Sequence, residues 1–327
     1  MSIVNYLSHF LPSLTDILMF TLFITFIGLI NKFNKPLSTQ SVGDLMKTLE
    51  DKYLYRFPKN GFILIRLDGR GFSNFTKIFK NSDSQNPFNP KFVHAMANTM
   101  NAMMIEFSAI CGFCCSDEIT LIIPSIKHQD STHIFDGKSS KILSLTSAKC
   151  SVLFLQFILQ EFKDDAKMQQ AIWKALPCFD SRAIGIPESK KELILDNLKW
   201  RSGDCWRNTV STVGRHILGK NRAKNMKCVK MIEEMRENKE NKFDINSLPQ
   251  YLLTGLLAKF KTTERKNDRG ETYSRKELFN FDGDLKCSAE MTDFLLGPPL
   301  EVGELTQNMT TLNLHEVIMS SEHLKSA

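Results

Sequence analysis

The chain has 327 residues, which is enough for about two ordinary domains or for one large domain with extensions. Hydrophobic residues make up 42% of it and charged residues 24%, which excludes an intrinsically disordered or collagen-like protein. Eight cysteines are too few for a disulfide scaffold in a chain of this length. We therefore expect free thiols in a reducing compartment, with no zinc site.

The formal net charge of +6 is unevenly distributed along the chain. Residues 1–280 carry +12, whereas residues 281–327 carry −6. A basic body permits an anionic partner such as RNA, although charge alone does not require one. We expect residues 281–327 to form a partly ordered acidic tail.

A long apolar run near the N-terminus is the first predicted element. Residues 11–30 contain a single charged side chain and reach the length of a membrane-spanning helix. Lys32 and Lys35 follow the run, which would place the rest of the chain in the cytosol. We expect residues 1–38 to be a hydrophobic leader or membrane anchor on a cytoplasmic protein. A mitochondrial presequence is disfavoured, because the first arginine is Arg56.

Residues 39–220 carry the clearest pattern of secondary structure. Short apolar runs typical of strands alternate with longer runs of helical periodicity. In chain order we expect a strand at 62–67, a helix at 90–108, strands at 110–115 and 118–123, a helix at 138–162 and a strand at 178–186. This β-α-β-β-α-β order is typical of the ferredoxin-like fold, so we predict a mixed α/β (α+β) domain here.

The segments that follow have weaker patterns. Residues 188–218 are predicted to be helical, with a break near Gly203. Residues 221–280 are predicted to form a helical C-terminal region. Within that region, the polar residues 261–275 are expected to form a loop or an exposed turn.

Three acidic residues lie where the predicted strands end. Asp68 follows the first strand, and Asp117 and Glu118 lie at the tip of the central hairpin. These strands are neighbours in a ferredoxin-like sheet, so we expect the three side chains to converge at one edge. Such oxygen ligands suit Mg²⁺, and two ions can activate an attacking oxygen and stabilise a leaving pyrophosphate. Turn capping explains either position alone, but their joint placement favours a metal site.

Five short motifs along this region form a recognisable series. In chain order they are Arg66-Leu67-Asp68-Gly69-Arg70-Gly71-Phe72, Phe75-Thr76, Ser116-Asp117-Glu118, Phe179-Asp180-Ser181-Arg182, and Trp200-Arg201 followed by Asp204-Cys205. At these spacings the series resembles the tRNA-histidine guanylyltransferase family. The resemblance covers about residues 40–220, and extends more weakly to about residue 275.

The resemblance implies a polymerase-type palm that extends RNA in the 3′-to-5′ direction after activating a 5′ end with ATP or GTP. It implies that Asp68, the Gly69 carbonyl and Asp117 hold two Mg²⁺ ions, with Glu118 as a further catalytic residue beside them. The nucleotide-binding residues that it implies are Arg70, Gly71, Phe72, Ser116, Lys138 and Lys141. The implied partners are tRNA and nucleoside triphosphates, and family members usually form oligomers, so we expect a dimer or tetramer.

One departure from the family pattern bears on the RNA substrate. Trp206-Arg207-Asn208-Thr209 stands where enzymes that modify tRNA-histidine usually carry His-Ile-Asn-Asn. In this respect the chain is closer to the guanylyltransferase-like branch, which repairs truncated 5′ ends. The candidate RNA-binding residues are Arg207, Asn208, Lys220, Arg222, Lys224 and Lys227. A solvated helix face explains this basic stretch equally well.

Two other functions remain open on the sequence. The first is a palm-fold nucleotide cyclase, although such enzymes usually carry paired glycines where this chain has Cys114-Cys115-Ser116. The second is a catalytically inactive RNA-binding or membrane scaffold. The three intact acids argue against the second alternative.

Overall fold

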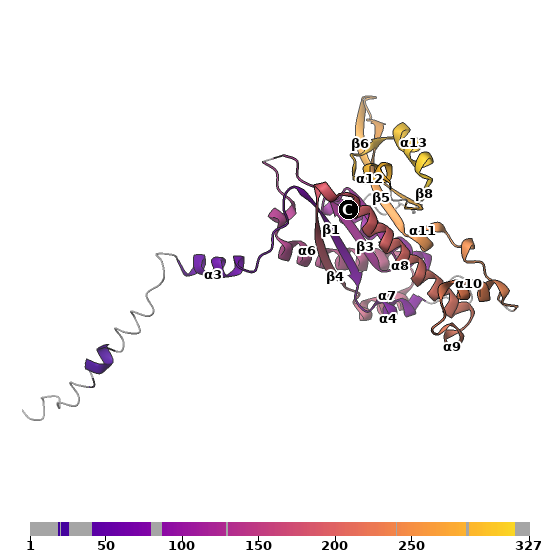
Figure 1. Cartoon of the computed structure of the whole chain (residues 1–327), viewed down its shortest axis with the longest axis horizontal. Coiled ribbons are helices and arrows are strands. Elements are labelled where there is room, and N and C mark those ends of the chain that lie inside the picture. The colour runs from indigo at the N-terminus through magenta and orange to yellow at the C-terminus, as the bar shows by residue number, and fades with distance from the viewer. Residues whose placement is uncertain are drawn as a thin grey trace, which may run out of the picture. The chain divides into compact units, whose positions relative to one another are not determined.

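The computed structural model describes residues 19, 21–25, 41–79, 87–128, 130–239, 241–285 and 288–317 (Figure 1). It divides into two compact units, Met1–Leu54 and Tyr55–Ala327. The membrane anchor predicted for residues 11–30 lies mostly outside the described residues, so it stays a prediction.

The described part of the first unit contains the helix α3, Val42–Asp51. The Ser41 hydroxyl begins it by accepting a hydrogen bond from the Asp44 backbone N–H at 3.2 Å. Apolar side chains recur along it at helical spacing and are exposed within the described residues. They are Val42, Leu45, Met46 and Leu49.

The second unit is built on a mostly antiparallel sheet whose strands begin at one edge in the order β4-β1-β3-β2. These strands are β1 (Gly61–Gly69), β2 (Cys111–Cys115), β3 (Glu118–Ile123) and β4 (Phe179–Pro187). Helix α5 (Pro90–Glu106) follows β1, and helix α6 (Ser139–Glu161) follows β3. The predicted ferredoxin-like order and its mixed α/β class are confirmed.

Both faces of this sheet are covered. Ile63, Ile65 and Leu67 of β1 pack with α5 and α6 on one face. Phe62 and Leu64 pack with helix α8 (Glu192–Ile217) on the other. Burial on both faces explains why the first strand has a continuous apolar run instead of an alternating pattern. Among the described helices, α6 is apolar and long enough to cross a membrane, but one side of it lies in this core.

Phenylalanine dominates the core beside the end of β1. The rings of Phe72, Phe75, Phe92, Phe154 and Phe179 form a network with centroid separations of 5.0 to 6.2 Å. Offset and edge-on contacts at these separations add to the burial of apolar area. The abundance of phenylalanine in this chain therefore serves core packing.

Helix α8, Glu192–Ile217, passes through Gly203 without the break that was predicted there. Its second half packs on three short helices in a separate apolar cluster with Met231 and Phe243. These helices are α9 (Lys220–Ala223), α10 (Cys228–Glu237) and α11 (Gln250–Thr254).

The helical prediction for residues 221–280 is wrong beyond Thr254. Strand β5, Leu256–Lys266, pairs with β2, and strand β6, Thr272–Gly283, pairs with β5. Residues 261–275, expected as a loop, instead form most of the outer end of this hairpin. Their polar sequence follows from exposure, because the two strands become solvent-exposed towards the turn that joins them.

The acidic tail predicted for residues 281–327 is ordered where the structure describes it. It forms α12 (Ala289–Leu296), β7 (Leu300–Glu301), α13 (Val302–Leu312) and β8 (Leu314–Val317). Phe294, Leu305 and Leu312 are buried in the same apolar cluster as Phe281 of β6. The acids lie largely on the exposed side of these helices, so a net negative charge is compatible with a packed segment.

Two glycines on α8 provide a matched test of this packing. A Cβ on Gly214 would lie 1.9 Å from Met231 Sδ on α10, whereas one on Gly203 would meet nothing closer than 3.6 Å. We expect Gly214→Ala to lower the free energy of unfolding by about 1–3 kcal/mol through overpacking. We expect Gly203→Ala to raise it by about 0.5–1 kcal/mol, through helix propensity. Urea denaturation checks both values, and equal effects would contradict the close approach of α8 and α10.

Candidate active site

Strand register places three carboxylates in one row across the sheet. Asp68 of β1 lies directly opposite Glu118 of β3 on one side and opposite Asp180 of β4 on the other. Residues that are directly opposite in a sheet point to the same face, which here is the face covered by α8. The row therefore reads Asp180, Asp68, Glu118.

Asp117 reaches the same edge from the hairpin turn. Its backbone carbonyl accepts a hydrogen bond from the Gly69 N–H at 3.0 Å, which fixes the turn against the end of β1. Burial raises the pKa of the Asp117 carboxyl above its ordinary value, and the neighbouring Asp68 charge raises it further. Its own backbone N–H and the Ser116 hydroxyl oppose these effects. Asp68 and Asp117 thus form a pair of electrostatically coupled carboxyls.

Glu118 has a different environment from the other two acids. Arg201 of α8 donates to both of its carboxylate oxygens, at 2.7 Å from Nε and 2.6 Å from Nη2. The same guanidinium donates to Asp204 at 2.5 Å, and Asp204 also pairs with Arg207. Burial raises the pKa of Glu118, while Arg201 and Arg66 act in the opposite direction. This bidentate pair anchors the central hairpin to α8.

Arg66 lies between the two acids nearest to it. One of its nitrogens is 3.7 Å from Asp68 and another is 3.8 Å from Glu118. Its Nε is buried and makes no hydrogen bond. Arg66 precedes Asp68 by two residues on β1. Its positive charge therefore offsets part of the negative charge of the row of carboxylates.

Comparisons with known proteins show which family this chain resembles. Residues 43–187 match the family model described as tRNAHis guanylyltransferase. An uncharacterized protein of Acanthamoeba polyphaga mimivirus is 34% identical over 220 residues, which cover 64% of this chain and 72% of the viral protein. The tRNA(His) guanylyltransferase of Schizosaccharomyces pombe is 30% identical over 151 residues, or 46% of this chain and 51% of the yeast enzyme. The chain belongs to the tRNAHis guanylyltransferase family.

Solved structures of family members share the fold. A bacterial tRNA(His) guanylyltransferase-like protein in complex with ATP has a TM-score of 0.60, with 21% identity over 78% of this chain and 97% of that protein. The tRNA(His) guanylyltransferase of Saccharomyces cerevisiae has a TM-score of 0.50, with 19% identity over 64% of this chain and 90% of the enzyme. In sequence, the chain spans about half the length of the curated guanylyltransferases that it matches, as with 51% for S. pombe.

Phe72, which the family resemblance implies as a nucleotide-binding residue, has a role in core packing instead. The Phe72 ring is 1% exposed and lies within the phenylalanine network, so its side chain is not available to a ligand. A Cβ at position 69 would lie 2.5 Å from this ring, which explains why a glycine ends β1. Gly71 has a positive φ of 71° and begins the short helix α4, Phe72–Phe75. Arg70 is exposed, and its backbone N–H donates to the Cys178 carbonyl at 2.9 Å.

The two lysines predicted to bind triphosphate lie at the beginning of α6. Lys138 forms an isolated β-bridge with Arg56. A later part of α6 contacts the edge of the sheet that carries the acids. There the Ser147 hydroxyl donates to the Phe179 carbonyl at 2.5 Å. Lys141 is six residues before that contact, about 9 Å along the helix axis. Contact of these lysines with a nucleotide therefore stays a prediction.

The residues predicted to bind RNA are exposed, but two of them have acidic partners. Arg222 donates to Glu234 at 2.7 Å, and Arg207 pairs with Asp204. The others are also exposed; they are Asn208, Lys220, Lys224 and Lys227. Glu234 neutralises part of the positive charge of this basic stretch. Contact of these residues with RNA stays a prediction.

Sequence reasoning assigned no site role to Asp180 or Arg201, although both lie in motifs that it noted. Their placement depends on strand register and on the packing of α8, which motif spacing does not reveal. A signal for Asp180 exists, because antiparallel pairing of the first and last predicted strands places it opposite Asp68. No comparable signal exists for Arg201.

The expectation that all cysteines are free thiols is wrong for one pair. Cys115, at the end of β2, forms a disulfide with Cys205 of α8, across a Cα–Cα distance of 5.9 Å. Cys115 directly precedes the Ser116-Asp117 turn, and Cys205 directly follows Asp204. The disulfide therefore joins β2 to α8, next to the Arg201–Glu118 pair, which joins β3 to the same helix.

Loss of the Arg201 guanidinium should cost stability, because it leaves a mostly buried carboxylate beside Asp68. We expect Arg201→Met to lower the free energy of unfolding by about 2–4 kcal/mol. Arg201→Lys should give an intermediate loss, since lysine cannot bind both oxygens in a planar fork. Combining Arg201→Met with Glu118→Gln should recover part of the loss, measured in a double-mutant cycle by urea denaturation. Additive effects would contradict the direct pairing.

The disulfide can be checked independently of function. After denaturation without reductant, an alkylating reagent should label Cys178 and Cys228 but neither Cys115 nor Cys205, as read by peptide mass spectrometry. Reduction before labelling should make both available. Cys205→Ser should expose Cys115 to labelling, and the same peptides from Cys150→Ser serve as the control. Full labelling of Cys115 in the unreduced wild type would disprove the bond.

Proposed function

We propose that this chain is a nucleotidyltransferase that adds guanylate or another nucleotide to the 5′ end of a tRNA. In this proposal the 5′ end is first activated with ATP or GTP, and the chain then grows in the 3′-to-5′ direction. The observation that carries the proposal is the coupled pair Asp68 and Asp117 at the edge of a palm-type sheet, in a chain that belongs to this family.

The donor set at this edge fits Mg²⁺. Among the residues that the structure describes, no group of three or more His, Cys, Asp or Glu side chains is arranged to hold a metal. Mg²⁺, however, commonly takes only one or two carboxylates and completes its shell with water and substrate phosphates. Burial and the neighbouring Asp68 charge raise the pKa of Asp117, and a bound cation would offset both effects. We propose these two side chains, with the Gly69 carbonyl, as the ligands.

Each neighbouring residue has a defined part in this proposal. Bound Mg²⁺ would neutralise triphosphate charge and favour attack by a hydroxyl oxygen. Asp68 and Asp117 hold their carboxylates at the edge because β1 and the hairpin turn are joined through Gly69 and Asp117. Arg201 keeps Glu118 in an ion pair, which limits it to a supporting role beside the reacting groups.

The choice of RNA follows from the departure at residues 206–209. Arg207 and Asn208 are exposed on α8, where tRNA-histidine enzymes usually carry a different sequence. We propose that repair of truncated 5′ ends is the main reaction, with tRNA-histidine as one substrate among others. A homo-oligomer of two or four chains belongs to the same proposal.

The reaction is tested with labelled GTP and 5′-monophosphorylated tRNAs, both intact and lacking the first nucleotide, in the presence of ATP and Mg²⁺. We expect incorporation at the 5′ end, greater on the truncated tRNAs. Asp68→Asn and Asp117→Asn should each reduce the rate at least about 100-fold. Glu192→Gln, which removes an exposed carboxylate at the start of α8, should retain the wild-type rate. Failure of the wild type to incorporate any nucleotide would refute the proposal, and a cyclic nucleotide product would indicate a cyclase.

The same variants give a readout that does not depend on activity. The native pKa of Asp117 is raised, so stability falls as the pH rises above the ordinary value, and the full loss is present once the pH exceeds the native pKa. Asp117→Asn should therefore have a higher Tm than the wild type at pH 7, and this gain should shrink as the pH falls towards 3.8, the ordinary value. Mg²⁺ should raise the Tm of the wild type more than that of Asp117→Asn. An equal response of both proteins to Mg²⁺ would contradict the assigned ligands.

A further inference from the structure

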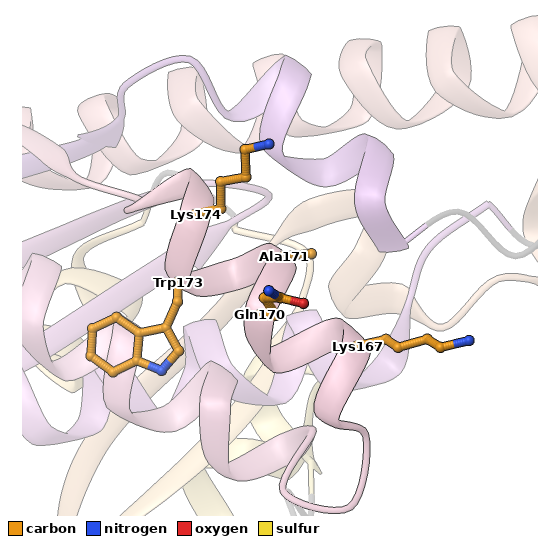
Figure 2. A pocket seen from close by; sticks show the side chains of 5 residues that line it. All are labelled: Lys167, Gln170, Ala171, Trp173 and Lys174. Carbon is orange, nitrogen blue, oxygen red and sulfur yellow. The ribbon is translucent and has the colours of Figure 1, made fainter.

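One exposed helix face has no role in the site described above. Helix α7, Ala166–Ala175, buries Ile172 in the main core and turns its other side outward. Lys167, Gln170, Ala171 and Lys174 follow one another at helical spacing, and with Trp173 they line an open hollow of about 610 Å³ (Figure 2). We call these five residues the α7 surface. Trp173 is 55% exposed, which is unusual for so large an apolar side chain.

The polar groups of the α7 surface are available to a ligand. Within the described part of the chain, neither Lys167 nor Lys174 has an ion pair or hydrogen bond, and the Trp173 indole has no acceptor. The nearest acid in sequence, Asp165, is occupied as the N-cap of α7, where it accepts from the Met168 backbone N–H at 2.9 Å. The surface therefore offers two lysines on one side of α7 and an exposed aromatic ring on the adjoining side of the same helix (Figure 2).

This surface adjoins the edge of the sheet that carries the acids. The chain leaves α7 and reaches Cys178, whose carbonyl accepts from the Arg70 N–H at 2.9 Å, and Phe179 then pairs with Gly69. Trp173 is five residues before Cys178, so it lies at most about 17 Å from that contact. In Figure 1, α7 and α4 lie together at the end of the sheet where β1 ends.

We propose that the α7 surface binds the RNA strand beside the reacting 5′ end, with a base stacked on Trp173 and the backbone phosphates on Lys167 and Lys174. Aromatic stacking combined with nearby cations is the usual chemistry of single-stranded RNA binding, and it tolerates different sequences. The inference rests on the proposed function, because it identifies how the substrate of that site is held.

A second copy of this chain is a less suitable occupant of the α7 surface. A symmetric dimer would bring the same face of both subunits together. Lys167 and Lys174 would then lie near their own counterparts with no acid on the surface to compensate them. Phosphates, by contrast, complement both lysines.

The test measures RNA binding without nucleotides, using a fluorescent 5′-monophosphorylated tRNA transcript that lacks its first nucleotide. We expect Trp173→Leu to raise the Kd about 5- to 100-fold, whereas Trp173→Phe, which keeps a stacking ring, should remain within about 3-fold of the wild type. The double change Lys167→Gln and Lys174→Gln should reduce the slope of log K against log salt by about 1.4. Its matched control is Lys127→Gln with Lys190→Gln, two exposed lysines at the opposite end of the sheet, which should leave the slope unchanged.

The outcomes separate this inference from the proposed function. In the transfer assay, Trp173→Leu should raise the KM for the RNA in parallel with the Kd, because its effect is on binding. If the wild type binds RNA through Trp173 but transfers no nucleotide, the surface stands and the enzymatic proposal fails. Wild-type affinity and salt slope in both the Trp173→Leu and double-lysine variants would overturn the inference. The inference would also be overturned if these variants lost self-association, measured by sedimentation, while their RNA affinity stayed unchanged.

Discussion

The antiparallel register of β1 with its two neighbours is the constraint on which the site depends. It places Asp68 between Asp180 and Glu118, and it brings the hairpin turn close enough for Gly69 to bond to Asp117. A slip of one residue would move Asp68 to the opposite face of the sheet, among the phenylalanines. Because both faces of β1 are buried by different helices, such a slip would also place Arg66 in an apolar core. Core packing and the position of the acids therefore specify the same register.

Four carboxyls at one edge of the sheet repel one another, and the surrounding cations offset this repulsion for some of them but not for others. Arg201 neutralises Glu118 by a bidentate bond, and Arg66 lies near both Glu118 and Asp68. Asp117 has no such cationic partner among the described residues, and its pKa is raised as a result of burial and of Asp68. The uncompensated charge thus remains where a cation and a triphosphate would be expected, while the compensated charge holds the hairpin to α8.

Much of this arrangement could be predicted from the sequence, because local pattern and topology agree from β1 to β4. The convergence of Asp68 with the central hairpin followed from strand order alone. What could not be predicted depends on long-range packing: the contact of Arg201 with Glu118, the pairing of Cys115 with Cys205, and the burial of Phe72. The strands β5 and β6 were missed because their exposed ends have the polar composition of a loop. The unbroken course of α8 through Gly203 was missed because neighbouring helices override intrinsic propensity.

The C-terminal segment continues the sheet instead of trailing from it. Lys259 of β5 is buried, and its ammonium donates to the carbonyls of Gly297 and Leu295 at the end of α12, at 2.7 and 3.4 Å. Strand β8 closes against β6 and shares its apolar cluster. Any shortened version of this chain that stops near residue 280 would leave an ammonium group without acceptors inside an opened core. The sheet that carries the acids and the acidic C-terminal segment are therefore parts of one folding unit, even though their sequences suggest two unrelated parts.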